Sequence, residues 1–242
     1  MHRFRRCPIR ASTARSPTSN PAPTVPATPS PIVPQEPGVR PARALPYELH
    51  VNASIYGGNT LRIEFANRGN QGAHFQVYAT NRTDGPWRYT VGARRVLHAD
   101  FDLTETNGVY AFSVYGPNGF VRMFAGNVSA ATARRRNHAQ PEVKAGYDIA
   151  NGNLYLKLRN HGAGHVTLTL ADNAYGAPAR QVTLHGGDER VEQWALASSH
   201  HWYDVTVSDG ANGTFSRRFA GHVENGRPSY SDPAAVAPVS AS

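Results

Sequence analysis

Apolar and polar residues alternate with a period of two over residues 60–66. Leu61, Ile63 and Phe65 would point to one face of a strand, and the polar residues between them to the other. Such alternation is typical of an antiparallel sheet with one face in water. No segment shows a sustained period of 3.6 residues with helix caps, so the pattern predicts an all-β fold with minimal helix.

Short segments of this kind recur along two stretches of the chain, with Gly, Asn, Asp and Pro between them. In the first stretch the predicted strands lie near 47–53, 60–66, 73–79, 87–92, 95–103, 109–115 and 120–128. In the second they lie near 142–149, 153–159, 165–171, 179–185, 189–196, 202–208 and 215–223. Seven short strands in about 85–90 residues are the size and rhythm of an immunoglobulin-like antiparallel β-sandwich.

The two stretches repeat one pattern with a period of about 93–95 residues. Four segments match in the same order: 61–69 with 154–162, 101–103 with 194–196, 110–114 with 203–207, and 124–128 with 219–223. Asn118-Gly119 and Asn212-Gly213 also occupy equivalent places, and each pair favours a type I′ hairpin because both positions tolerate positive φ. The sequence therefore predicts a tandem pair of β-sandwich modules.

The composition separates these modules from an N-terminal leader. Ten of the 18 prolines fall between Pro8 and Pro41, among residues that include almost no large apolar side chains. Such a segment cannot offset the entropy cost of ordering, so we expect it to be disordered. The predicted organisation is a Pro/Ser/Arg-rich leader (1–44), module 1 (45–129), a basic linker (130–140), module 2 (141–226) and a C-terminal tail (227–242).

The positive charge also lies mainly in the leader. With seven Arg and one acid, the leader holds +6 of the formal net charge of +8. The folded part is therefore close to neutral, which argues against a nucleic-acid groove on a folded face. The run Arg134-Arg135-Arg136 lies in the linker, where a solvated connector is a simpler interpretation than a phosphate-binding cluster.

Compartment is left open by the sequence. The single cysteine, Cys7, lies in the leader and excludes an intramolecular disulfide. Arg5-Arg6 near the start is followed by no apolar run, so neither a signal peptide nor a membrane anchor is predicted. No stretch is long and apolar enough for a transmembrane segment.

The histidines do not form a metal motif. His200 and His201 are neighbours, and in a strand their side chains would point to opposite faces. His161 and His165 flank a glycine-containing turn and could meet, but no carboxylate or cysteine stands at ligand spacing. We therefore expect solvent-exposed or hydrogen-bonded histidines, with no metal site and no cofactor.

Other candidate chemistry is equally sparse. His98, Asp100 and Asp102 share one strand face, which we interpret as the solvated face opposite Phe101. No serine-nucleophile elbow, phosphate-binding loop or zinc signature is present, so no catalytic residue is predicted.

The positions of the three tryptophans predict different roles for them. Trp194 occupies the place of Phe101 in the repeat and is expected in the core, while Trp202 could cap the sandwich or face outward. Trp87 begins a strand next to Arg88 and is the one candidate for stacking on a sugar or choline group. Ordinary packing is the alternative for Trp87.

Several phrases carry a resemblance to a known family. They are residues 35–50, 115–120, 201–204, 217–221 and 226–233. Together with the repeat, they resemble the C-terminal region of bacterial phosphocholine-preferring phospholipases C of the non-haemolytic and haemolytic type, over about residues 35–235. In that family two such modules follow a larger catalytic domain similar to alkaline phosphatase and acid phosphatase, and full-length members are secreted or periplasmic.

The resemblance implies a non-catalytic accessory region. Phosphodiester hydrolysis of phosphatidylcholine-type lipids would belong to the upstream domain, which holds the metal ligands and the nucleophile, and no position here matches them. The chain would then be a truncated or split gene product with that catalytic domain and a choline-lipid surface as partners. The alternatives are an independent β-sandwich module that binds a lipid or carbohydrate surface, and hydrolysis of phosphocholine esters by this chain alone.

Overall fold

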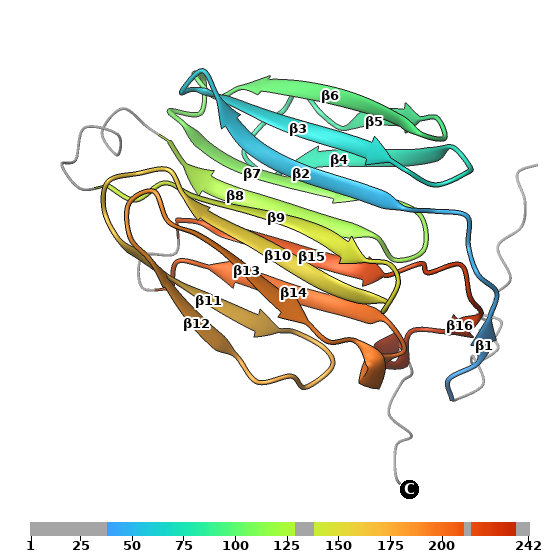
Figure 1. Ribbon diagram of the computed structural model, residues 1–242. Coiled ribbons are helices and arrows are strands. Elements are labelled where there is room, and N and C mark those ends of the chain that lie inside the picture. The colour runs from blue at the N-terminus through green and yellow to red at the C-terminus, as the bar shows by residue number, and fades with distance from the viewer. Residues whose placement is uncertain (1–37, 129–137, 211–213, 236–242) are drawn as a thin grey trace, which may run out of the picture. The chain divides into compact units, whose positions relative to one another are not determined.

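The computed structural model describes residues 38–128, 138–210 and 214–235 (Figure 1). In these ranges the chain forms β-strands and two short 3₁₀ helices, η1 (Ala197–Ser199) and η2 (Pro233–Ala235), and it contains no α-helix. None of the helices in these ranges is long and apolar enough to cross a membrane. The prediction of an all-β fold is confirmed.

All fourteen predicted strands are present, with ends shifted by at most a few residues. Module 1 contains β2 (Leu49–Tyr56), β3 (Thr60–Asn67), β4 (Ala73–Ala79), β5 (Trp87–Val91), β6 (Arg95–Asp102), β7 (Val109–Tyr115) and β8 (Val121–Asn127). Module 2 contains β9 (Pro141–Asp148), β10 (Asn153–Asn160), β11 (Val166–Asp172), β12 (Arg180–Leu184), β13 (Glu189–Trp194), β14 (Trp202–Ser208) and β15 (Ser216–His222).

Each module is a sandwich of three strands against four, and the two four-stranded halves join into one sheet. The three-stranded sheets have the orders β2-β3-β6 and β13-β10-β9. The eight-stranded sheet has the order β12-β11-β14-β15-β8-β7-β4-β5, so that β8 of module 1 pairs antiparallel with β15 of module 2 (Figure 1). The sequence did not predict this junction.

The fourth strand of each module distinguishes the sandwich from a constant-type immunoglobulin domain. There the fourth strand belongs to the sheet of the first two strands, whereas here β5 pairs with β4 and β12 pairs with β11. Both fourth strands are five residues long and lie at the two edges of the eight-stranded sheet.

The alternating apolar residues form the cores, as predicted. The side chains of Leu61, Ile63 and Phe65 on β3 are fully buried. The equivalent residues of β10, namely Leu154, Leu156 and Leu158, are buried in the same way. The period-two pattern therefore located the inner face of both modules.

The Asn-x-Gly sequence that ends β3 and β10 has a structural explanation. Asn67 is buried; its Nδ2 donates to the carbonyls of Gln71 and Val91, while its Oδ1 accepts from the Gly69 amide. A Cβ on Gly69 would lie 2.3 Å from the Pro46 carbonyl oxygen. This repeated motif therefore folds a loop against the segment that precedes each module's first strand.

The hairpin at Asn118-Gly119 has the predicted geometry. Asn118 and Gly119 have φ values of 55° and 69°, and the Phe120 amide donates to the Pro117 carbonyl. Two positive φ values in a four-residue turn are the signature of type I′. The equivalent pair Asn212-Gly213 lies outside the described residues, as do Arg134–136 and residues 1–37.

The described structure extends further at both ends than the predicted modules. Residues Pro41–Ala42, assigned above to the leader, form β1, and Ser229–Tyr230, assigned to the tail, form β16; the two strands pair antiparallel (Figure 1). The pairing uses backbone groups of two short segments that have no apolar alternation, so the pattern analysis could not detect it. We call residues 38–47 the strap.

Candidate functional site

The strands that face each other between the modules make the first half of the candidate site. β2 and β9 are edge strands of the two three-stranded sheets. The Asn52 side chain bridges them, because its Oδ1 accepts from the Ala145 amide at 2.9 Å and its Nδ2 donates to the Ala145 carbonyl at 3.4 Å. The modules are thus joined at both of their sheets.

A buried arginine lies at this junction. Arg122 of β8 is 0% exposed, and its Nη1 donates to the carbonyls of Val121 and Ala220 at 2.7 and 2.8 Å. Its Nη2 donates to the hydroxyls of Tyr147 and Tyr203 at 2.7 and 2.9 Å. Within the described residues it has no carboxylate within ion-pair distance, so hydroxyl and carbonyl dipoles and aromatic rings offset its charge.

Arg217 of β15 makes the corresponding hydrogen bonds, which run from module 2 to module 1. Its side chain is 2% exposed, its Nη1 donates to the carbonyls of Ala125 and Ser216, and its Nη2 donates to the Tyr110 hydroxyl at 2.7 Å. Each arginine therefore reaches a backbone carbonyl of the other module, at Ala220 or Ala125.

Both arginines open the sequence Arg-x-Phe-Ala-Gly, at 122–126 and 217–221. A Cβ on Gly126 would lie 2.2 Å from the hydroxyl of Tyr110, its cross-strand partner. The glycine leaves room for that tyrosine to lie across the sheet toward Arg217. Sequence analysis missed the arginines, although Arg122 shares the alternating buried face of β8 with Phe124.

The two arginine sites differ at one position. Tyr147 pairs with Leu154 and Ile55 pairs with Leu61, and these leucines are equivalent in the repeat, so Ile55 occupies the place of Tyr147. The Tyr147 hydroxyl bonds Arg122 and also donates to the Leu49 carbonyl at 2.8 Å. Burial, followed by the neighbouring Tyr203, raises the pKa of Tyr147 well above its ordinary value.

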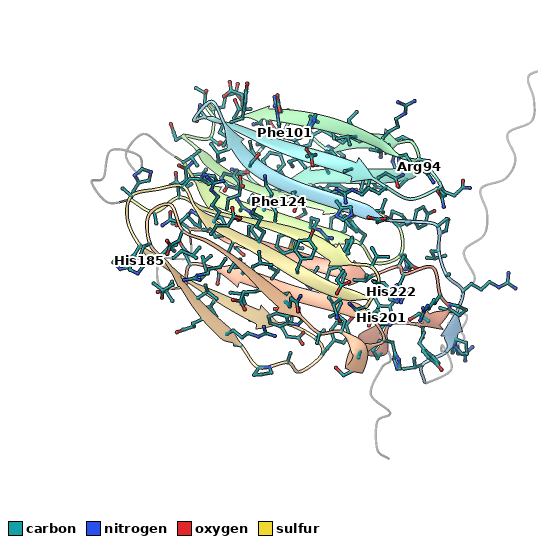
Figure 2. The ribbon with its side chains drawn as sticks, viewed as in Figure 1. Arg94, Phe101, Phe124, His185, His201 and His222 are labelled. Carbon is teal, nitrogen blue, oxygen red and sulfur yellow. The ribbon has the colours of Figure 1, made fainter. Side chains whose placement is uncertain are left out.

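An open groove lies beside the strap. Its volume is about 410 Å³, and it is lined by Ala42, Arg43, Leu45, Asn118, Trp202, His222, Glu224, Ser229, Tyr230, Ser231 and Asp232. Figure 2 places His222 and His201 at the end of the sandwich where β1 and β16 lie. The groove therefore brings together the strap, the β7–β8 hairpin and the end of β15.

Glu224 connects these three parts. Its Oε1 accepts from Asn118 Nδ2 and lies 3.0 Å from His222 Nδ1, while its Oε2 accepts from the Leu45 amide at 3.1 Å. Both Glu224 and His222 have largely buried side chains. The carboxylate thereby holds the strap and module 1 against module 2.

Ser229, His222 and Glu224 follow the order hydroxyl, imidazole and carboxylate that activates a nucleophile in hydrolases. His222 Nε2 lies 3.0 Å from Ser229 Oγ. However, the Ser229 hydroxyl donates to the His200 carbonyl at 3.0 Å, and His222 Nε2 faces that same carbonyl at 3.1 Å. The geometry therefore suits a structural clamp rather than an activated serine.

The tryptophans pack largely as aromatic core residues do. Trp194 is buried, as predicted. Trp202 is also buried, donates from Nε1 to the Tyr230 carbonyl, and packs against the His222 ring with the centroids 4.9 Å apart and the planes tilted by 56°. Trp87 is half-buried, with its ring 4.9 Å from that of Phe101. Ligand stacking on Trp87 stays a prediction.

The polar row on β6 lies on the solvated face, as expected. Arg62 donates to both oxygens of Asp100 at 2.7 and 2.6 Å, and this guanidinium lowers the pKa of Asp100. Asp102 accepts from the Thr104 hydroxyl and amide. His98 faces Glu64 at 3.8 Å.

The histidine neighbours are not in a strand, which corrects the geometry assumed above. His200 and His201 follow η1 with φ values of 54° and 70°. His201 Nδ1 lies 2.9 Å from the Gly152 carbonyl, and His161 pairs with Glu142 at 3.6 Å. Among the described residues no three His, Cys, Asp or Glu side chains gather as metal ligands would.

The chain is similar in sequence to known proteins. The family described as "Bacterial phospholipase C, C-terminal domain" matches residues 41–127 and 141–222, one match for each module. A non-hemolytic phospholipase C of Burkholderia pseudomallei is 51% identical over 201 residues, which cover 82% of this chain and 28% of that protein. A non-hemolytic phospholipase C of Pseudomonas aeruginosa is 44% identical over 228 residues, which cover 93% of this chain and 32% of that protein.

A hemolytic phospholipase C of Pseudomonas aeruginosa is 37% identical over 224 residues, which cover 82% of this chain and 30% of that protein. The chain thus spans about a third or less of the length of these curated relatives. The family match includes both arginines and all three tyrosines of the junction. The chain therefore belongs to the family of bacterial phospholipase C C-terminal domains.

Proposed function

We propose that the two modules form a non-catalytic accessory unit of a bacterial phospholipase C, and that phosphodiester hydrolysis belongs to a separate catalytic domain. The observation that carries the proposal is the family match, which covers both modules while the relatives are about three times longer. The buried polar groups described above serve as hydrogen-bonded connectors, which supports a structural role.

The strap suggests how the unit would be coupled to that domain. Because the family is described as a C-terminal domain, the rest of each relative precedes the matched part. A preceding domain would join this unit through the strap, whose Arg40 amide donates to Ser231 and whose Leu45 amide donates to Glu224. We infer that these two hydrogen bonds fix the strap, and that the fixed strap holds the catalytic domain against the groove face in a defined orientation.

The test combines this chain with the catalytic region of the Burkholderia pseudomallei relative, produced without its matched C-terminal part. We expect a complex in analytical size-exclusion chromatography. Arg43→Glu reverses an exposed charge in the groove and should weaken the complex, whereas Arg190→Glu on the edge strand β13 should not. Absence of a complex with the unmodified chain would remove the docking proposal.

Activity is the second readout of the same experiment. The chain alone should not hydrolyse phosphatidylcholine with divalent metal supplied, and turnover by the purified chain would overturn the non-catalytic assignment.

The further prediction, that the chain is a truncated or split gene product, is tested by reading the DNA upstream of its coding sequence. A catalytic-domain reading frame there would support it, and unrelated sequence would contradict it.

A second candidate function is an independent module that binds a lipid or carbohydrate surface, and it rests on half-buried Trp87. Flotation with phosphatidylcholine vesicles and a glycan-binding assay test it. Binding that is lost in Trp87→Ala but retained in Trp87→Phe, which preserves an aromatic ring beside Phe101, would favour it. No measurable affinity in either assay would remove it.

A further inference from the structure

A cavity lies between the modules at the end of the junction that contains Arg217. Its volume is about 220 Å³, and its polar lining includes Ser54, Gln140, Glu142, His161 and Arg217. One water occupies about 30 Å³ in the liquid, so the cavity has room for an ion of several heavy atoms. It is lined from both modules, by β2 on one side and by β9 with its preceding residues on the other.

The guanidinium that lines this cavity is under-satisfied. Arg217 Nη2 has one hydrogen-bond partner, the Tyr110 hydroxyl, whereas Nη2 of Arg122 has two. The Nε atom is buried without a partner in both arginines and does not distinguish them. No carboxylate within the described ranges comes within ion-pair distance of Arg217. A buried cation without a counter-charge costs free energy, which an anion in contact with it would offset.

The equivalent site at Arg122 shows which hydrogen-bond acceptor the Arg217 site lacks. At the equivalent site the Tyr147 hydroxyl accepts a second hydrogen bond from Arg122 Nη2 and donates to the Leu49 carbonyl. The space beside Tyr147 is only about 20 Å³. Ile55 stands in the place of Tyr147 and has no hydroxyl, so at Arg217 the acceptor is absent and the space is open.

We propose that this cavity binds a small oxyanion of the phosphate type, held by Arg217 with the side-chain donors of Ser54 and Gln140. Guanidinium groups bind oxyanions through charge-assisted hydrogen bonds. The Glu142 carboxylate, which would repel an anion, lies on the same wall. It is paired with Lys144 Nζ at 3.3 Å and with His161 Nε2 at 3.6 Å. The site is distinct from the strap groove and does not depend on the accessory function proposed above.

The experiment titrates the full chain with inorganic phosphate at constant ionic strength, set with chloride, and records isothermal titration calorimetry and the melting temperature. We expect saturable binding and a rise in Tm with phosphate concentration. Glycerol 3-phosphate in a parallel series separates free phosphate from a phosphomonoester as the preferred form, since a longer ligand must extend toward the cavity mouth.

Ile55→Tyr is the decisive variant, because it rebuilds the Arg122 site at Arg217 and fills the cavity with a side chain that the fold already accommodates at Tyr147. It should weaken phosphate binding at least about tenfold, given the strength of hydrogen bonds to charged groups. Arg217→Met should abolish binding, with circular dichroism to check that the variant folds.

A triple variant in which Arg134, Arg135 and Arg136 are replaced by Ser controls for binding to the basic run of the linker. Under the proposal this variant binds phosphate as the unmodified chain does. The proposal is overturned if the unmodified chain shows no saturable binding, if Ile55→Tyr leaves the affinity unchanged, or if the triple variant alone loses it.

Discussion

Two arginines decide how the modules of this phospholipase C C-terminal region meet. Arg122 belongs to module 1 yet donates to Ala220 of module 2, and Arg217 donates in return to Ala125 of module 1. Their charges are offset by carbonyls, tyrosine hydroxyls and aromatic rings such as Phe120, whose centroid lies 3.9 Å from the Arg122 guanidinium carbon. Among the described residues, no carboxylate lies within ion-pair distance of either arginine, so these groups are the partners that the structure offers to both charges.

Removing one hydroxyl from this network should destabilise the fold. Tyr147→Phe leaves Arg122 with one fewer acceptor and the Leu49 carbonyl without its donor. We expect the free energy of unfolding to fall by about 1–3 kcal/mol, the usual cost of unsatisfied buried polar groups. Urea denaturation measures it, and Tyr155→Phe on an exposed strand position should change stability far less. Equal losses in the two variants would contradict the assignment.

His50 predicts a pH dependence of stability. Burial, as the largest cause, lowers the pKa of His50 despite its hydrogen bond to Glu48; Arg68 and Arg122 lower it further. In the unfolded chain a histidine titrates near pH 6.5. As pH falls below about 6.5, the unfolded chain takes up the proton first, so the free energy of unfolding decreases until the lower folded pKa is passed.

The measurement compares urea unfolding of the unmodified chain and His50→Gln between pH 7.5 and 5. We expect a shallower loss of stability in the variant, by about 1.4 kcal/mol for each unit that separates the folded and unfolded pKa values. His98→Gln, on the solvated face of β6, serves as the control and should keep the slope of the unmodified chain. The same slope in all three proteins would refute the role of His50.

At the scale of single elements, the repeated Asn-x-Gly sequence is needed for a loop that packs closely against another segment. Asn67 and Asn160 hold the loops that follow β3 and β10 through three and five side-chain hydrogen bonds. The glycines two residues later permit the backbone to approach the segments before β2 and β9. The Asn-x-Gly sequence in the matched segments 61–69 and 154–162 is therefore explained by its role in folding, not by a role in catalysis or binding.

Gly69→Ala tests this explanation. The added methyl group would lie 2.3 Å from the Pro46 carbonyl oxygen and 2.7 Å from the Glu48 amide nitrogen, both backbone atoms that cannot rotate away. We expect a loss of at least about 2 kcal/mol in the free energy of unfolding. Gly92→Ala is the matched control, because its nearest contact is the Arg95 Cγ at an ordinary 3.6 Å. If Gly69→Ala left the free energy of unfolding unchanged, the backbone at Gly69 would not be packed tightly against Pro46.

At the scale of the whole molecule, the continuous sheet predicts that the two modules unfold together. The β8–β15 pairing and the two arginines tie them, although the repeat suggests independent units. A variant that retains only Trp87 reports on module 1, and Trp87→Phe, which retains Trp194 and Trp202, reports on module 2. Their fluorescence transitions in urea should coincide; separate midpoints would show that the junction is weak.

The sequence predicted the fold more completely than the site. Strand positions, inner faces and the I′ hairpin at Asn118 follow from alternation and turn chemistry, which are local properties. The candidate site depends on residues such as Glu224, which accepts hydrogen bonds from the Leu45 amide and the Asn118 side chain, both far upstream in the sequence. No local pattern indicates such contacts.

By itself the sequence determined that the repeated part of the chain is all-β, that it contains two related modules, and which side chains of each strand face inward. The tertiary structure alone decided that β8 pairs with β15, that β1 pairs with β16, and that Arg122 and Arg217 are buried. The reason is physical: alternation records which residues leave water, whereas strand edges pair through backbone groups that every residue except proline offers alike.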